Sequence, residues 1–309
     1  MQYHAVSIGE AVPRENFDAV IQSVFDSAIN LRLANEDRLI TLLISDHYEL
    51  PQGIRVDKKI PFQSLTPSTS LRASVGLRAA SRGGILRFDS SPLTIDLRGA
   101  RVWKCRVPEL HADMRSDVVI QAWSSAWDLL NKGQRLKQTE IVADDLFQLN
   151  IGSLLSQRIS KPVMQLISST EQFDIQGSIL AAEKMIGLGP GVTPSGDDIL
   201  IGFLASLWST AGKNQTQLSF IRSFGDALMQ IAKQTTEISC TYLYHATQGQ
   251  FSSSLSNLAE GIASGNQVEK AIEEAMQVGH SSGMDSVTGL LIGLAIWNAE
   301  IIPHPVPLP

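Results

Sequence analysis

The sequence has 309 residues, 43% of them hydrophobic and 18% charged, and a formal net charge of −6 at pH 7. This length suits one large or two modest domains, and the apolar fraction is enough for a substantial core. Because an acidic chain without basic runs repels phosphate backbones, we expect no nucleic-acid partner. The two cysteines, Cys105 and Cys240, predict neither a disulfide framework nor a thiolate metal site, which favours the reducing cytoplasm.

Membrane and targeting segments are not expected. The first residues, MQYHAVSIGE, lack the basic and apolar regions of a signal peptide. The longest apolar runs, residues 199–208 and 287–297, are shorter than the roughly 18 residues that a membrane span needs. We therefore predict core helices at both positions and no membrane partner.

Residues 1–115 are predicted to form a β-rich N-terminal domain. Strands are expected at residues 27–33, 38–44, 54–56, 73–77, 84–88 and 93–97. A short helix is expected at 15–22, and residues 98–115 form the crossing between the two halves. Short strands separated by glycine and proline indicate a small barrel or sandwich.

From residue 116 the apolar period becomes helical, which predicts an all-helical domain over residues 116–301. Helices are expected at residues 118–131, 144–158, 174–186, 195–210, 217–233, 236–247, 253–263, 268–278 and 282–299. A loose proline-rich tail is predicted at 302–309. The predicted fold class is therefore α+β, with a β-rich N-terminal part and an all-helical C-terminal part.

The most unusual stretch is GLGPGVTPSGDD, residues 187–198. Its glycines permit positive φ or close approach of a ligand, while Pro190 and Pro194 stiffen the loop. We expect Ser195 to be the N-cap of the following helix and Asp198 its capping-box partner. A glycine-rich loop before a helix N-terminus is typical of an anion site, because free N–H groups and the helix dipole both favour negative charge.

A weaker copy of this stretch occurs 87 residues later. Ser282-Gly283-Met284-Asp285 repeats Ser195-Gly196-Asp197-Asp198, and Gly289 falls where Gly202 fell. The repeat predicts two equivalent apolar helices whose N-termini lie near one another about a pseudo-twofold axis. The alternative is two unrelated capping boxes on two buried helices.

The candidate site residues cluster around these two helix starts. Substrate binding is assigned to Gly189, Gly191, Thr193, Ser195, Gly196, Asp198, Thr236, Ser239, Ser281, Ser282 and Asp285. Asp197 and His280 are the catalytic candidates, because a carboxylate and an imidazole at such a loop are suited to moving protons. The alternatives are helix capping for the aspartates, close packing for Thr236 and Ser239, and a polar loop position for His280.

No residue is assigned as a metal ligand, although Mg²⁺ bound by one or two of these aspartates plus substrate oxygens is chemically reasonable. No HExxH or cysteine–histidine arrangement occurs, so a zinc enzyme or cysteine nucleophile is not expected. The loop also lacks the Walker lysine, the dinucleotide-binding context and the hydrolase serine elbow.

The stretch GLGPGVTPSGDDILIGFLA resembles a formerly uncharacterised family, the oxamate carbamoyltransferase subunit of anaerobic allantoin degradation. The family core reads GLGPGLTPSGDD, so Val192 is the only departure. Further matches are Ser23-Val24-Phe25 with Asn30-Leu31, Ile95-Asp96-Leu97 with Ala100 and Trp103, Thr236 with Ser239, and Gly279-His280-Ser281-Ser282-Gly283 with Asp285. They extend from about residue 20 to 297.

The resemblance implies a cytoplasmic protein of purine-nitrogen metabolism that works with two larger partner subunits and a carbamate kinase. It implies transfer of a carbamoyl group between carbamoyl phosphate and oxamate, with oxalurate as a product. No assigned catalytic residue is carried over.

Three hypotheses follow. The first is an enzyme subunit that binds a carbamoyl phosphate-like or oxamate-like anion at the paired helix N-termini. The second is a non-catalytic assembly subunit. The third is a Mg²⁺-dependent helical hydrolase that uses Asp197, Asp198 and Asp285 as ligands.

Overall fold

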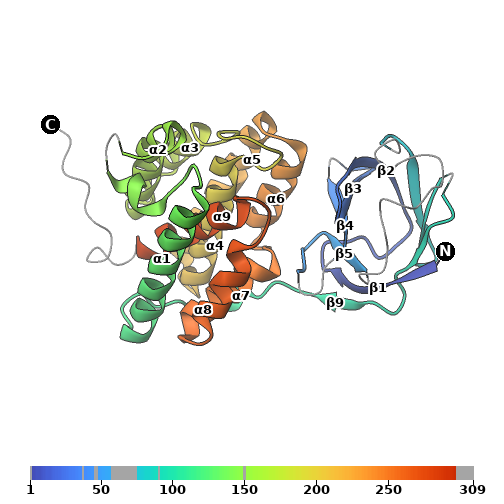
Figure 1. The fold of residues 1–309 in the computed structure, drawn as a ribbon, viewed down its shortest axis with the longest axis horizontal. Coiled ribbons are helices and arrows are strands. Elements are labelled where there is room, and N and C mark those ends of the chain that lie inside the picture. The colour runs from blue at the N-terminus through green and yellow to red at the C-terminus, as the bar shows by residue number, and fades with distance from the viewer. Residues whose placement is uncertain are drawn as a thin grey trace. The chain divides into compact units, whose positions relative to one another are not determined.

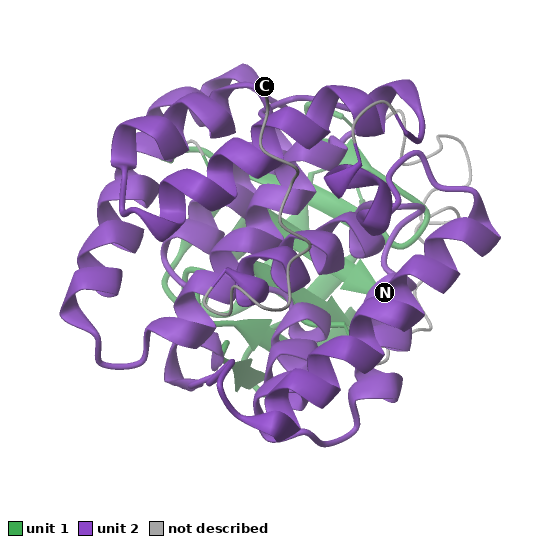
Figure 2. Cartoon of the chain, turned by 90° about the vertical axis from the view of Figure 1, so that its left-hand side faces the viewer, with its two compact units in different colours: residues 1–105 green, residues 106–309 purple. Residues whose placement is uncertain are grey.

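The computed structural model describes residues 2–36, 38–44, 48–56, 75–89, 91–148 and 151–296. The chain divides into two compact units, residues 1–105 and 106–309, which Figure 2 shows in different colours. The division thus falls after Cys105, whereas the sequence placed a boundary after residue 115. The predicted proline-rich tail at 302–309 lies outside the described residues.

The first unit is a closed β-barrel with one extra strand. Its strands are β1 (Gln2–Gly9), β2 (Phe17–Val24), β3 (Ala28–Leu33), β4 (Leu39–Ile44), β5 (Gly53–Val56), β6 (Arg78–Arg82), β7 (Ile85–Phe88), β8 (Thr94–Asp96) and β9 (Arg101–Trp103). The order is β5-β4-β3-β2-β6-β7-β8-β1-β9, and an additional β5–β1 pairing closes the barrel. Closure pairs strands that would otherwise leave open edges. The predicted barrel and the α+β class are therefore confirmed.

Two predictions in this unit are wrong. Residues 15–22 are not helical, since β2 begins at Phe17 and alternates buried Phe17, Ala19 and Ile21 with exposed or half-buried residues. This period of two is that of a strand with one face in the core. The strand expected at 73–77 is also wrong. Gly76 has a φ of 91° and lies in a turn, and the strand that follows it, β6, begins only at Arg78. Residues 73 and 74 lie outside the described residues.

The second unit contains nine α-helices among the described residues. They are α1 (Asp117–Lys137), α2 (Leu154–Glu171), α3 (Ile175–Glu183), α4 (Ser195–Ala211), α5 (Gln215–Ile231), α6 (Glu237–Thr247), α7 (Ser253–Ser264), α8 (Val268–Met276) and α9 (Ser282–Ala295). The helix expected at 144–158 is wrong: a 3₁₀ helix, η3 (Ala143–Phe147), is followed by α2. Pro162 lies inside α2.

Helices α4 and α9 lie at the centre of the helical unit, and Figure 1 shows the other helices around them. Their backbones are in direct contact because glycines face carbonyl groups. A Cβ at Gly202 would lie 1.8 Å from the Ser286 carbonyl oxygen, and one at Gly289 would lie 1.9 Å from that of Ile199. Gly202 and Ile199 are equivalent to Gly289 and Ser286 in the sequence repeat. The contact is therefore reciprocal, as the predicted pseudo-twofold axis requires.

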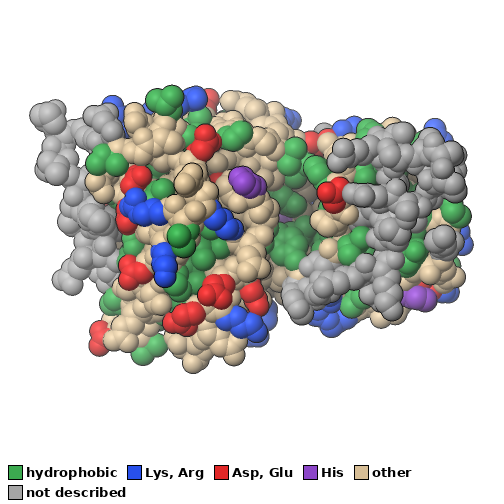
Figure 3. Space-filling view, in the orientation of Figure 1, with side chains coloured by type: hydrophobic (Ala, Val, Ile, Leu, Met, Phe, Trp, Pro, Cys, Tyr) green, Lys and Arg blue, Asp and Glu red, His purple; other side chains and the backbone are tan. Residues whose placement is uncertain are grey.

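The surface and the helix lengths add two observations. On the face shown in Figure 3, acidic and basic side chains are interspersed over the helical unit and are not gathered by sign. Among the helices of the described residues, none combines the length and the apolar character needed to cross a membrane.

Candidate functional site

The loop before α4 has the backbone that its glycines predict. Gly187, Gly189 and Gly191 have φ angles of 70°, 119° and 92°, a region that other residues rarely adopt. The N-cap of α4 is Pro194, so the predicted capping role of Ser195 is wrong. Pro194 has an extended ψ and its carbonyl accepts the first helical hydrogen bonds, which places Ser195 inside the helix.

The first amides of both helices are largely used within the protein. The N–H of Gly196 donates to the Leu188 carbonyl at 2.9 Å, and those of Asp197 and Asp198 donate to the Pro194 carbonyl. In α9, the N–H of Gly283 donates to the Val278 carbonyl at 2.9 Å. A cradle made of many free amides is therefore not formed, and side chains decide what these helix starts can bind.

Three segments meet at the site through hydroxyl groups. The Thr193 and Ser282 hydroxyl oxygens lie 2.7 Å apart, which joins the loop to the start of α9. The Thr236 hydroxyl donates to the Val192 carbonyl at 2.6 Å and accepts from the Ser239 N–H as the N-cap of α6. The loop, α6 and α9 thus converge, although they are distant in the sequence.

Asp197 is completely buried, and both of its oxygens are occupied by donors of the protein. Oδ1 accepts from the Gly187 N–H at 2.8 Å, and Oδ2 accepts from the Thr235 hydroxyl. Burial raises the pKa of Asp197, while the Thr235, Gly187 and Ser239 donors oppose that rise. The carboxylate therefore ties the start of the loop and the approach to α6 onto α4.

Asp198 and Asp285 differ from Asp197 in what they contact. Their exposed fractions are 4% and 1%, yet no group of the described residues meets Oδ2 of Asp198 or either oxygen of Asp285 with normal hydrogen-bond geometry. Serine and threonine hydroxyls lie close enough to lower the pKa values of both aspartates without completing such bonds. Burial, and then the charge of Asp285, raise the pKa of Asp198 well above its usual range. Burial also raises the pKa of Asp285 to about 6, although the Ser195 and Ser281 hydroxyls act to lower it.

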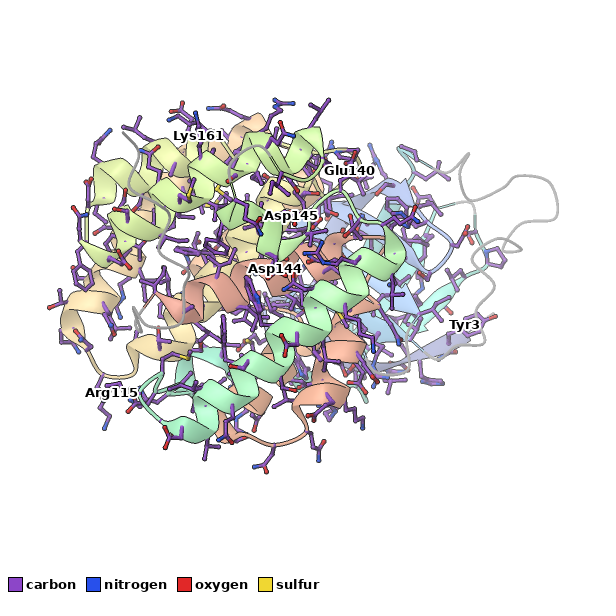
Figure 4. All side chains as sticks on the ribbon, turned by 60° about the vertical axis from the view of Figure 1, so that its left-hand side comes forward. Tyr3, Arg115, Glu140, Asp144, Asp145 and Lys161 are labelled. Carbon is purple, nitrogen blue, oxygen red and sulfur yellow. The ribbon has the colours of Figure 1, made fainter. Side chains whose placement is uncertain are left out.

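Asp198 and Asp285, called the acidic pair below, each interact with the start of the other's helix. Ser282 at the start of α9 lowers the pKa of Asp198 in α4, and Ser195 at the start of α4 lowers that of Asp285 in α9. Each aspartate therefore lies near the first serine of the other helix. Glu140, labelled in Figure 4 between α1 and α2, adds a repulsion that raises the pKa of Asp285.

The remaining candidates lie around this centre at different depths. A Cβ at Gly189 would lie 2.8 Å from the Ser195 nitrogen, whereas one at Gly191 would meet open space. The Ser239 hydroxyl is buried near Asp197, while His280 is exposed in the loop before α9. Sequence reasoning missed Thr235, for which the adjacent Thr236 was the available signal, and Glu140, for which no signal existed.

The three aspartates of the hydrolase hypothesis do not converge as a ligand group. Among the residues that the structure describes, no group of three or more histidine, cysteine or acidic side chains is arranged to hold a metal ion. Both oxygens of Asp197 are also occupied, so the three-aspartate magnesium site of the hydrolase hypothesis is not formed here.

The fold defines an α+β protein with a closed β-barrel unit and a helical unit built on two equivalent helices. Two family models match the chain: the AllH family N-terminal domain over residues 4–102, and oxamate carbamoyltransferase subunit AllH over residues 185–294. The chain belongs to this family, so the predicted resemblance is confirmed. Membership makes the chain a subunit of an oxamate carbamoyltransferase complex, which implies other subunits. No solved structure matches the chain.

Proposed function

We propose that this subunit binds oxamate or carbamoyl phosphate at the paired starts of α4 and α9. The observation that carries the proposal is the unpartnered, buried carboxyl pair of Asp198 and Asp285. Burial of a polar group without a hydrogen bond costs free energy, so such groups are expected where a ligand supplies the missing partner. Both residues lie within the segment matched by the second family model.

The chemistry of the site fits both ends of such a ligand. Oxamate and carbamoyl phosphate each carry an NH₂ group, which donates hydrogen bonds, and an anionic group. The unpartnered carboxyl oxygens accept from the NH₂ group. The hydroxyls of Thr193, Ser195 and Ser282 donate to the carboxylate or phosphate, and the positive ends of two helix dipoles favour that charge. In this proposal the ligand replaces the hydrogen bond between Thr193 and Ser282.

The raised pKa values make an anion compatible with two aspartates. A carboxyl group that keeps its proton near neutral pH carries no charge and donates a hydrogen bond. Burial raises the pKa of Asp285 to about 6 and that of Asp198 well above its usual range. The pair therefore repels an incoming anion less than two exposed aspartates do.

Calorimetric titration of the full chain with oxamate and with carbamoyl phosphate tests the proposal. We expect measurable binding of at least one ligand, and at least about tenfold weaker binding in Asp285→Asn and in Ser282→Ala, a loss of about 1.4 kcal/mol. Asp128→Asn, an exposed aspartate on α1, is the matched control and keeps its affinity. No heat with either ligand, alone or with the partner subunits present, contradicts the proposal.

We further propose, from the family resemblance, that two larger subunits complete the enzyme in the cytoplasm and that it serves allantoin degradation. The assembly hypothesis makes the opposite prediction for the acidic pair. If the chain only holds partners together, Asp198→Asn leaves the activity of the reconstituted complex intact. Activity loss with unchanged assembly, measured by size-exclusion chromatography, favours the binding site.

A further inference from the structure

We propose that Asp198 and Asp285 act together as a proton-sharing pair, which accepts the proton of the attacking nitrogen and returns one to the leaving phosphate. This inference rests on the proposed function, because it assigns a catalytic task to residues that were proposed above to bind the ligand. The observations that carry it are geometric: Asp198 and Asp285 occupy equivalent positions in two helices whose backbones are in contact, both are buried, and carboxyl oxygens of both lack a partner of hydrogen-bond geometry among the described residues.

The surroundings of Asp198 and Asp285 allow only one of the two carboxyl groups to be ionised at a time. Two buried carboxyl groups near one another do not both ionise readily, because like charges in a low-dielectric site repel strongly. The other charged groups that act on the pair are also acidic: Asp197 on Asp198, and Glu140 on Asp285. Of the helix starts, Ser195, Ser281, Ser282 and Thr193 contribute hydroxyls that carry no charge. One carboxyl therefore keeps a proton while the other accepts hydrogen bonds.

The proton balance of carbamoyl transfer matches such a pair. The oxamate nitrogen forms a bond to the carbonyl carbon of carbamoyl phosphate, and the bond from that carbon to the phosphate oxygen breaks. The nitrogen loses one proton and the departing phosphate takes up one, so oxalurate and hydrogen phosphate are the products. The unprotonated carboxylate accepts the first proton and the protonated carboxyl donates the second. The pair ends with the one proton that it held at the start.

The pseudo-twofold arrangement explains how the same pair serves both directions. Asp198 and Asp285 occupy equivalent positions in α4 and α9, and each lies near the first serine of the other helix. Because the pKa of Asp198 is raised well above its usual range and that of Asp285 to about 6, Asp198 is the member that holds the proton at the start. In the reverse reaction, oxalurate nitrogen is protonated by one member while phosphate gives its proton to the other.

The pH profile of the reconstituted complex tests this task. The wild type should show a bell-shaped dependence of kcat, since activity needs one proton on the pair. Asp198→Asn and Asp285→Asn should each lower kcat about 100-fold or more and remove one limb of the bell. Asp128→Asn should change neither kcat nor the profile. An unchanged profile in both pair variants overturns the proposal.

Infrared spectroscopy of the full chain gives a readout that does not depend on activity. A protonated-carboxyl band should persist between pH 6 and about 8 in the wild type and in Asp128→Asn, and be weakened in Asp198→Asn. In Asp285→Asn the band should titrate at lower pH, because the charge of Asp285 no longer raises the pKa of Asp198. Absence of the band overturns proton sharing even if ligands bind. Failure of both ligands to bind the wild type contradicts the proposed function itself, so the two failures are distinguished.

Discussion

Two buried acidic centres, one in each unit, differ in how their charge is compensated. In the β-barrel, Glu49 has an exposed fraction of 6%, and its carboxylate contacts the guanidinium groups of Arg55 at 3.2 Å and Arg101 at 2.8 Å. It also accepts from the Ser7 hydroxyl. In the helical unit, Asp198 and Asp285 are as deeply buried, but no cation acts on them, and Oδ2 of Asp198 and both oxygens of Asp285 lack a partner of normal hydrogen-bond geometry among the described residues.

This difference separates a structural carboxylate from a candidate functional one. The Glu49 cluster joins β1, β5 and β9 of the barrel through Ser7, Arg55 and Arg101, so its contacts hold strands together. The aspartate pair has only serine and threonine hydroxyls near it and no cation, so its ionisation costs stability. A protein keeps such uncompensated groups at sites where activity needs them.

The largest expected loss of stability comes from removing Glu49, the carboxylate whose charge is compensated by arginines. Glu49→Ala removes the shared partner of Arg55 and Arg101 and should lower the free energy of unfolding by about 3–5 kcal/mol, because a buried charge loses its pair. Scanning calorimetry of the full chain measures the change. Asp18→Ala, which breaks the exposed ion pair with Arg82, is the control and should cost no more than about 1 kcal/mol. Equal effects of the two variants contradict the comparison.

The second largest loss of stability is expected at the contact between α4 and α9, which positions Asp198 and Asp285. Gly202→Ala puts a methyl group against the Ser286 carbonyl, so α4 and α9 must separate, at an expected cost of about 3 kcal/mol. Gly289→Ala should cost a similar amount, because its contact with Ile199 is the reciprocal one. Urea unfolding of the full chain gives the values. Gly99→Ala meets no atom within 4 Å and should stay near the wild type, so three similar losses refute the packing argument.

The smallest effect concerns ionisation of Asp285 itself. Its pKa is raised from the unfolded value of 3.8 to about 6, so the folded state holds a proton that the unfolded state has lost between these values. This contribution is fully present below pH 3.8 and is lost as the pH rises through about 6. It changes the free energy of unfolding by about 2–3 kcal/mol and is constant at higher pH.

Asp285→Asn has no carboxyl group at this position, so its free energy of unfolding does not show this decrease with rising pH. The difference in stability between the variant and the wild type should therefore move in favour of the variant by about 2–3 kcal/mol between pH 4 and pH 8. Urea midpoints over this range measure it. Asp128→Asn should give a curve parallel to that of the wild type. A parallel curve for Asp285→Asn as well would show that burial does not raise the pKa of Asp285.

The helical unit was easier to predict than the barrel, because helix signals are local in the sequence whereas the burial of strand residues depends on distant partners. Helix starts and apolar stripes recur locally, so eight of the nine expected helices coincide with helices of the described residues, and the exception is the one expected at 144–158. Strand β1 was missed because Ser7, a polar residue, is completely buried, which disturbs the alternation of apolar and polar residues. Its burial depends on Glu49, a residue 42 positions away.

By itself, the sequence determined the glycine and proline loop, the repeated serine and aspartate at two helix starts, and the family. Only the tertiary structure decided that Asp197 is fully bonded whereas its neighbour Asp198 is not. Adjacent residues on a helix point about 100° apart, so they face different neighbours. Those neighbours, Thr235 for one and the start of α9 for the other, are brought there by packing between segments far apart in the chain.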